Sequence, residues 1–172
     1  MRLLTGLTLA ALFATSALTQ AEARIPQGCF ARDYTADHLA KTPRQHIASL
    51  RISLGPDPWG NGFISAIVTG RFSDQGRARS EGFSDRSFRQ AAFCGETGGK
   101  TTCQVECDGG SFTIRSARGD SLEIETSSFT LEVPGAGAEE GCGGLSDLAE
   151  TGSAKTTYRL TRAPASACPP WE

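Results

Sequence analysis

The chain is predicted to be all-β: a small antiparallel up-and-down β-barrel of about eight strands, stapled by disulfides, with a two-sheet β-sandwich as the alternative. Three observations predict this class. Apolar residues recur at every second position, glycine-rich turns separate these segments, and six cysteines stand in a chain of 172 residues with a formal net charge of −2. Such patterning is typical of antiparallel sheets with one buried face. A chain of this length forms one domain that can close a small barrel.

Residues 1–23 are predicted to be a secretory signal peptide rather than part of the fold. Arg2 supplies a positive charge, the stretch from Leu3 to Leu18 is apolar without an acidic residue, and Ala21-Glu22-Ala23 matches an A-x-A cleavage site. The apolar stretch is short for a membrane span, and a retained anchor helix is the alternative. We therefore expect an exported protein, periplasmic or secreted, with a single barrel domain over residues 24–172 and no stable membrane span.

The strands are assigned from the side chains expected to face the core. In Ser111–Arg115, for example, Phe112 and Ile114 point inward and their neighbours outward. The eight candidate segments are Arg44–Leu54, Phe63–Phe72, Ser87–Cys94, Thr101–Cys107, Ser111–Arg115, Ser121–Glu125, the inward set Phe129, Leu131 and Val133, and the pair Tyr158 and Leu160. Helix is expected only over Thr35–Lys41, with Thr35 as the N-cap, and over Ser146–Ala149.

Three glycine-containing turns set the expected register of the central strands. Gly98-Gly99 as a two-residue turn places Cys94 directly opposite Cys103. Gly109-Gly110 as the next turn pairs Val105 with Ile114 and Cys107 with Phe112, and the three-residue turn Ala117-Arg118-Gly119 places Ile114 opposite Leu122. In each case inward side chains face inward side chains, as a sheet with one buried face requires.

An even number of cysteines in an exported chain predicts three disulfides. The register predicts a Cys94–Cys103 bridge. Cys29 precedes the first expected strand and Cys168 follows the last, and these strands are neighbours in a closed barrel, so Cys29 is paired with Cys168. Cys107 is then left for Cys142. The alternative, a zinc site on Cys103 and Cys107, lacks the second ligand pair that such sites require.

The sequence predicts no catalytic, cofactor-binding or metal-binding residue, and it favours a non-catalytic protein. It has no G-x-S-x-G motif, and the disulfides leave no cysteine to act as a nucleophile beside His38 or His46. The carboxylate pairs Glu106 with Asp108 and Glu123 with Glu125 fall on the outward face, where solvated charges are expected. A weak cation site in the glycine-rich loop that carries Glu139, Glu140, Asp147 and Glu150 is the alternative.

Two surface segments are candidates for contact with a ligand or partner. The loop Gly55–Gly62 carries Trp59 on a rigid Pro/Gly backbone, where it serves either as a contact residue or as a lid on the barrel. The loop after the second candidate strand is rich in arginine, with Arg77, Arg79 and Arg86 as candidate contacts for an anionic group. Acidic residues are interleaved with them, so a solvated polar loop is the competing interpretation.

Two functions from different classes follow. The first is an exported barrel that binds a small apolar or anionic molecule in an interior cavity larger than about 300 Å³. The second is a protein-binding module, such as an inhibitor of an envelope enzyme, with a filled barrel and an exposed apolar or arginine-rich patch. The near-neutral charge argues against nucleic acid as a partner.

Overall fold

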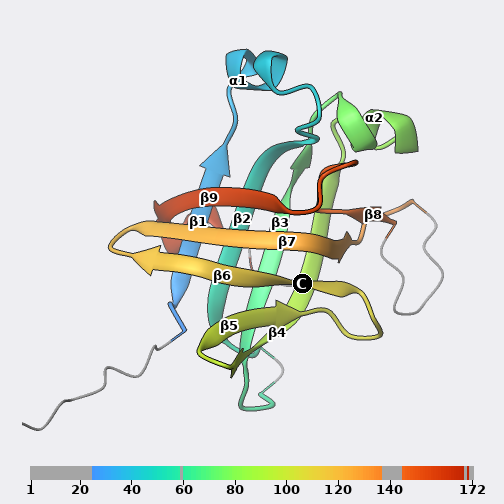
Figure 1. Ribbon diagram of the computed structural model, residues 1–172. Helices are drawn as coiled ribbons and strands as arrows, with labels where there is room; N and C mark the ends of the chain where they lie inside the picture. The colour runs from blue at the N-terminus through green and yellow to red at the C-terminus, as the bar shows by residue number, and fades with distance from the viewer. Residues whose placement is uncertain (1–24, 59, 137–144, 169, 171–172) are drawn as a thin grey trace, which may run out of the picture.

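The computed structural model describes residues 25–58, 60–136, 145–168 and 170, and it confirms a closed antiparallel β-barrel (Figure 1). Eight strands close the barrel: β1 (Gly28–Asp33), β2 (Ile47–Pro56), β3 (Ile64–Phe72), β4 (Ser87–Thr97), β5 (Lys100–Gln104), β6 (Gly110–Arg118), β7 (Ser121–Leu131) and β9 (Thr156–Ala163). A two-residue strand, β8 (Ser146–Asp147), pairs with the end of β7. The remaining elements are α1 (Ala36–Lys41), α2 (Gly76–Glu81) and the 3₁₀ turn η1 (Ala165–Ala167).

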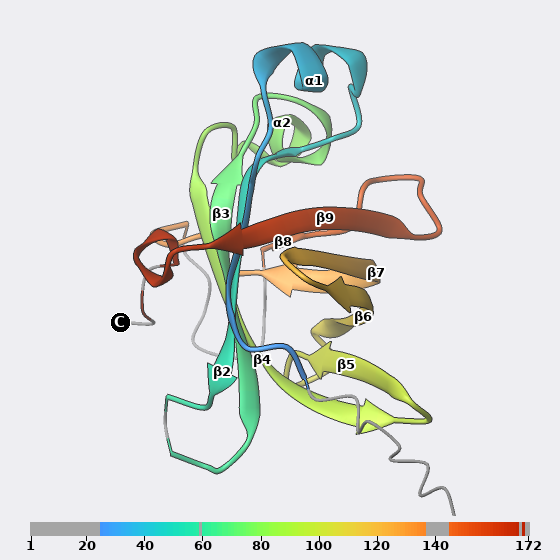
Figure 2. The ribbon, with the colours of Figure 1, turned by 90° about the vertical axis from the view of Figure 1, so that its left-hand side faces the viewer.

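The barrel has up-and-down topology. Each strand from β1 to β7 pairs with the next along the chain, and β9 pairs with both β7 and β1, so no edge of the barrel sheet is left open. The alternative of two separate sheets is therefore not adopted. In Figure 2, β2, β3 and β4 stand along one wall while β6, β7 and β9 run across them in the other wall, and both helices lie at one end of the barrel.

The element assignments need four corrections. The strand β1 was not expected, and the two segments assigned around Leu122 and Leu131 are one continuous strand, β7. The segment Ser146–Ala149 is not helical but supplies β8, and the arginine-rich loop contains the unpredicted helix α2. Helix α1 is confirmed with Thr35 as its N-cap, since the Thr35 side chain accepts a hydrogen bond from the His38 amide.

The first of the three predicted turns is confirmed and the other two are wrong in register. Cys94 lies opposite Cys103 across Gly98-Gly99. Phe112 pairs with Cys103 instead of Cys107, because β5 ends at Gln104 and a longer loop follows in which Cys107 adopts a φ of 53°. At the third turn, Ile114 lies opposite Ile124 rather than Leu122, because Arg118 pairs directly with Ser121 and a bulge follows between Ile114 and Ser116.

Two of the three predicted disulfides are present in the described residues. Cys29–Cys168 joins β1 to the segment that follows β9, and Cys94–Cys103 crosses the β4–β5 hairpin. Cys107 is also disulfide-bonded, but the predicted partner Cys142 lies outside the described residues, as does the predicted signal peptide. Disulfides of this kind are typical of an oxidising, exported environment. In the described part of the chain no helix is long and apolar enough to cross a membrane.

Gly70 of β3 is required by close packing and not by backbone conformation. A Cβ at this position would meet the backbone oxygen of Ser49 and the ring of Phe88. We expect Gly70→Ala to lower the free energy of unfolding by about 1–3 kcal/mol, because an overpacked core must shift to make room. Urea unfolding of the purified chain measures this change.

Gly55→Ala is the matched control, since a Cβ on Gly55 of β2 has open space within 4 Å. That variant is expected to lie within about 1 kcal/mol of the wild type. Equal unfolding midpoints for the two variants would contradict the packing argument.

Candidate binding surface

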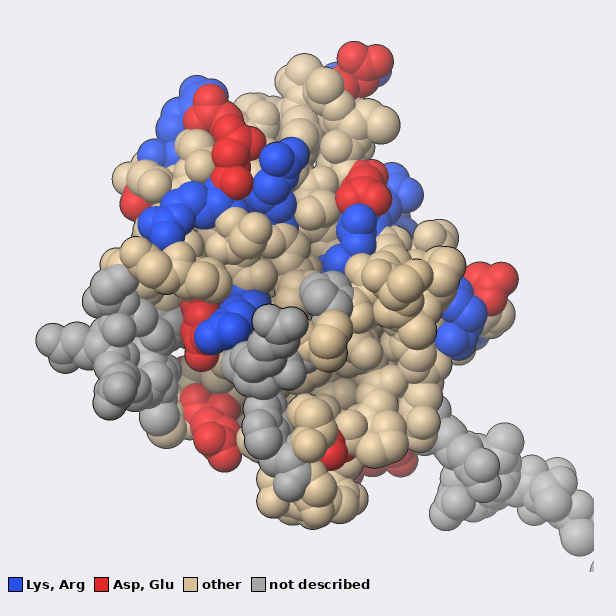
Figure 3. Space-filling view, turned by 180° about the vertical axis from the view of Figure 1, so that it is seen from behind, with Lys and Arg blue, Asp and Glu red and all other residues tan. Residues whose placement is uncertain are grey.

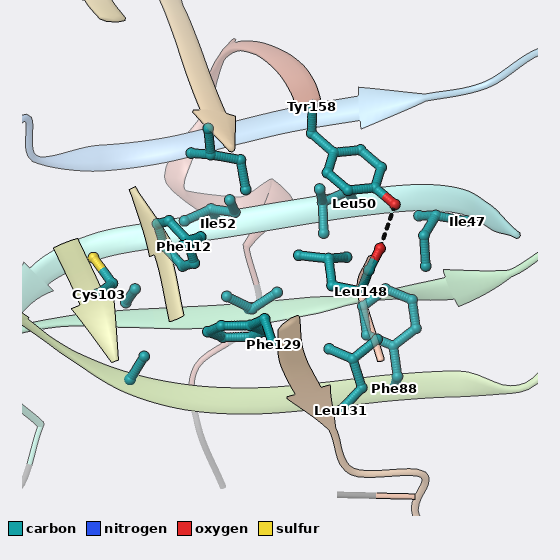
Figure 4. Packing of buried hydrophobic residues seen from close by; sticks show 14 of the residues in the cluster. Ile47, Leu50, Ile52, Phe88, Cys103, Phe112, Phe129, Leu131, Leu148 and Tyr158 are labelled. Atoms are coloured by element: carbon teal, nitrogen blue, oxygen red, sulfur yellow. Dashed lines mark hydrogen bonds between the residues drawn. The ribbon is translucent and has the colours of Figure 1, made fainter. Parts of the chain in front are cut away.

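The interior of the barrel is occupied by side chains. Leu50, Ile52, Phe112, Ile124 and Phe129 are 0% exposed. A void large enough for water would expose the side chains that line it, so none adjoins these residues. The rings of Phe112 and Phe129 lie 5.3 Å apart at the centre of the packed cluster (Figure 4). An interior ligand site therefore has no room around these side chains, and the candidate sites lie on the outside.

One end of the barrel is closed by residues 145–149, which we call the plug segment. The side chain of Leu148 is fully buried in the core, and its carbonyl accepts a hydrogen bond of 2.7 Å from the Tyr158 hydroxyl (Figure 4). The Asp147 carboxylate accepts hydrogen bonds from the amides of Phe129 and Ala149 and from a serine hydroxyl. Asp147, which sequence reasoning offered as a cation ligand, therefore caps backbone groups instead. Burial raises the pKa of Tyr158, so its hydroxyl remains a donor.

His46 is buried next to the plug segment. Its Nε2 atom lies 2.8 Å from the carbonyl oxygen of Asp147, whereas its Nδ1 atom is buried without a partner. Burial lowers the pKa of His46, and the positive charge of Arg77 adds to the effect. A neutral ring that donates from Nε2 accounts for the Asp147 contact. His46 is therefore a structural side chain that holds the plug segment.

The three arginines predicted as contacts each bind a group of the chain itself. Arg79 bonds to Asp74, which lowers the pKa of that exposed carboxyl. Arg77 lies 3.4 Å from Glu81 on the same helix. Arg86 donates to the Pro134 carbonyl at 2.6 Å and stacks over the ring of Phe83. Trp59, the fourth predicted contact, lies outside the described residues.

The outward carboxylates form cross-strand ion pairs. Glu123 bonds to Arg159 at 2.6 Å and Glu125 to Lys155 at 2.7 Å. The pKa of Glu125 is lowered chiefly by the hydrogen bond from Lys155. In the described residues no group of three His, Cys, Asp or Glu side chains is arranged to hold a metal ion.

A groove with a volume of about 490 Å³ crosses the outer face of β2, β3 and β4. Three arginines line it, one from each strand: Arg51, Arg71 and Arg89. Thr69 of β3 stands between Arg51 and Arg89 in the same row of the sheet. Ser49 and Ser87 flank Arg71 in the next row, so the arginines are interleaved with hydroxyls.

The three arginines of the groove differ in how far they are already paired. Arg51 makes a two-point contact with Asp33, at 2.7 and 2.9 Å, and Arg89 lies 3.3 Å from Glu132. Arg71 is exposed, and its side chain makes no hydrogen bond or ion pair in the described part of the chain. Arg71 is therefore the guanidinium of this groove that is available to an outside anion.

An aromatic pair lies at the other end of the same face. Phe63 directly precedes β3 and is 58% exposed, and its ring packs edge-on against Phe93 of β4 with 6.0 Å between centroids. Between the pair and Arg71, Cys168 and Pro170 lie near Ile67 on this face of the sheet, and Ile67 is 9% exposed. Figure 3 shows this face, with Lys and Arg gathered over its upper part among Asp and Glu, and with few basic side chains in its lower part.

Sequence reasoning found part of this surface. Arg71 and Arg89 lie just before and just after the arginine-rich loop that the sequence indicates, and the alternation of β3 gives Phe63 and Arg71 the same face. Arg51 was missed as a neighbour because its place beside Thr69 depends on the β2–β3 register. The groove can be predicted from the alternate residues of each strand that point outward, taken together with the order of the strands in the sheet. The spacing of arginines along the loop does not predict it.

Comparisons with protein-family models, with curated proteins and with solved structures found no match to this chain.

The Tyr158 hydroxyl is expected to hold the plug segment in place. Tyr158→Phe removes the hydroxyl that donates to the Leu148 carbonyl and leaves that oxygen buried, which lowers the free energy of unfolding by about 1–3 kcal/mol. Thr157→Val, which removes an exposed hydroxyl from the same strand, is expected to change it by less than about 0.5 kcal/mol. Chemical denaturation measures both, and equal stabilities would contradict the role of Tyr158.

His46 is expected to make stability depend on pH. Because burial holds its pKa below the ordinary value of 6.5, the unfolded chain takes up a proton at a pH where the folded chain stays neutral. The stabilisation is therefore present above pH 6.5 and is lost as the pH falls below it. Urea unfolding at pH 7.5 and pH 5.5 is expected to show a larger loss for the wild type than for His46→Gln. An equal loss in both would contradict this assignment.

Proposed function

We propose that the protein is an exported, non-catalytic module that binds a partner protein on the outer face of β1–β4, as an inhibitor of an envelope enzyme would. The observation that carries this proposal is the exposed Phe63. It is the large hydrophobic side chain left exposed among the described residues, and it shares a face with Arg71, which has no partner within them. Exposed aromatic and arginine side chains are the residues that most often dominate protein interfaces.

The dimensions of this face suit a protein partner. Phe63 and Arg71 are eight positions apart along one strand direction, which corresponds to roughly 26 Å. A standard interface covers about 800 Å² on each partner, a patch roughly 30 Å across. One partner of ordinary size therefore reaches both ends of the face at once.

The charge of the face specifies the chemistry of the partner. Arg71 offers a guanidinium fork with no partner in the described part of the chain, and such a fork binds carboxylates through two parallel hydrogen bonds. The partner is therefore expected to present an acidic side chain opposite Arg71 and an apolar side chain against the Phe63–Phe93 pair. The filled core supports this function over a ligand held inside the barrel.

Affinity capture with matched baits tests the proposal. Four versions of the mature chain are immobilised and exposed to an envelope extract of the producing cells: wild type, Arg71→Ala, Phe63→Ala and the control Arg118→Ala. Arg118 is exposed at the end of β6 and loses the same charge outside the groove. A partner protein retained by wild type and control, and reduced at least tenfold on both other baits, is the expected result, since a charge-assisted contact contributes about 1.5–3 kcal/mol. Equal retention by all four baits would exclude this face.

A small anionic ligand is the second candidate, and the hydroxyl-lined groove beside Arg71 favours it. Analysis of the low-mass fraction from the same baits separates the two functions. An anionic compound that is lost with Arg71→Ala and retained with Phe63→Ala supports ligand binding, whereas loss of a protein with both variants supports the module.

A further inference from the structure

A second pocket lies at the helical end of the barrel and shares no lining residue with the groove. It has a volume of about 360 Å³ and is formed where α2 meets two loops. Its lining consists of Pro43, Arg44, Gly76, Arg77, Ser80 and Thr151. Two of these six described residues are arginines, two carry hydroxyls and none is acidic.

Neither arginine of this pocket has its donors satisfied by the chain. The Arg44 side chain is exposed and makes no hydrogen bond or ion pair within the described residues. Arg77 has a long contact of 3.4 Å with Glu81, and its Nε–H is buried without an acceptor. Glu81 is held elsewhere, because its other carboxylate oxygen accepts a 2.6 Å hydrogen bond from Ser146 of the plug segment. An unpaired buried donor is uncommon in native proteins, and a bound ion or water is one of the explanations for such a group.

The two arginines are carried by backbone that is held together independently of any ligand. Gly76 has a φ of +57°, and a Cβ on it would stand 2.8 Å from the Arg44 carbonyl oxygen, so the loop packs directly on the start of α2. The neighbouring Gln75 amide donates to the carbonyls of Thr42 and Gln45, at 2.8 Å each, on either side of Pro43 and Arg44. The pocket is therefore preformed, which lowers the entropic cost of binding.

We propose that this pocket binds a phosphoryl group, with Arg44 and Arg77 as its ligands and the Thr151 hydroxyl beside them. Guanidinium forks match phosphate oxygens in geometry, and a phosphoryl group has enough acceptor oxygens to take hydrogen bonds from both arginines at once. A single carboxylate has two oxygens and would leave the donors of one arginine without an acceptor. The same chemistry is supplied by free phosphate and by a phosphate ester of a larger molecule.

Binding of sodium phosphate to the full mature chain tests the site, with sodium chloride at equal ionic strength as the reference. The readouts are calorimetry and the arginine Nε–H signals in nitrogen-15 NMR spectra. We expect saturable binding, with the Arg77 signal shifted, and at least tenfold weaker binding in Arg44→Gln and in Arg77→Gln. Arg79→Gln removes the same charge from the same helix outside the pocket, and its affinity is expected to stay within twofold.

The alternatives have distinct results. No saturable binding to the wild type, or an equal loss in Arg79→Gln, overturns the proposal, and so does acetate binding as tightly as phosphate. Because Arg44 is exposed, Arg44→Gln tests the site even where Arg77→Gln does not fold. Tighter binding of glycerol 1-phosphate than of phosphate supports the site and assigns it to an ester, whereas the reverse order assigns it to the free ion. Phosphate binding does not depend on Phe63 or Arg71, so this test is independent of the proposed partner surface.

Discussion

The pairing of β1 with β9 is the constraint on which the rest of the structure depends. Only three residue pairs form this seam, with Phe30 opposite Arg162 at its centre. Without it, β1 and β9 would be the edges of an open sheet with unpaired backbone groups. The Arg162 guanidinium lies 4.8 Å from the centre of the Phe30 ring, on the same face of the sheet, and also donates to the Gln27 carbonyl, so one side chain of β9 contacts both β1 and the segment before it. The Cys29–Cys168 bridge then ties the same strand to the chain beyond β9.

The direction in which each side chain of a strand points could be predicted from the sequence better than the register between paired strands. Alternation is a local property, and the side chains expected inward, such as Phe112 and Ile124, are fully buried. Register depends on turn geometry, and the turn after β5 departs from the two-glycine expectation because Cys107 and Asp108 both take positive φ. That shift moved the pairing from Cys107 to Cys103, an even number of positions, so inward residues still met inward residues. The strand β1 was missed because its short sequence offers little alternation beyond Phe30.

The candidate sites show the same division between local and long-range information. Arginines in one stretch were visible in the sequence, but whether each is available depends on carboxylates that the fold brings from elsewhere. Glu132 reaches Arg89 from 43 positions away, and Arg71 has no such neighbour among the described residues. Likewise, Arg44 and Arg77 share a pocket because Gln75, next to α2, binds the loop that carries Arg44. Ion pairs between residues that lie far apart in the sequence cannot be predicted from composition or spacing.

The two described disulfides differ in how much of the chain they enclose, and this difference sets the order in which they can form. Cys94 and Cys103 are 9 positions apart, in a hairpin of the kind that forms within microseconds. Cys29 and Cys168 are 139 positions apart, and bringing such distant residues together costs about 2.4 kcal/mol more in loop entropy. The first bridge can form on a chain that has folded no further than this hairpin. The second bridge requires the two ends of the domain to meet. A chain in which Cys29 and Cys168 are joined is therefore a chain whose barrel has closed.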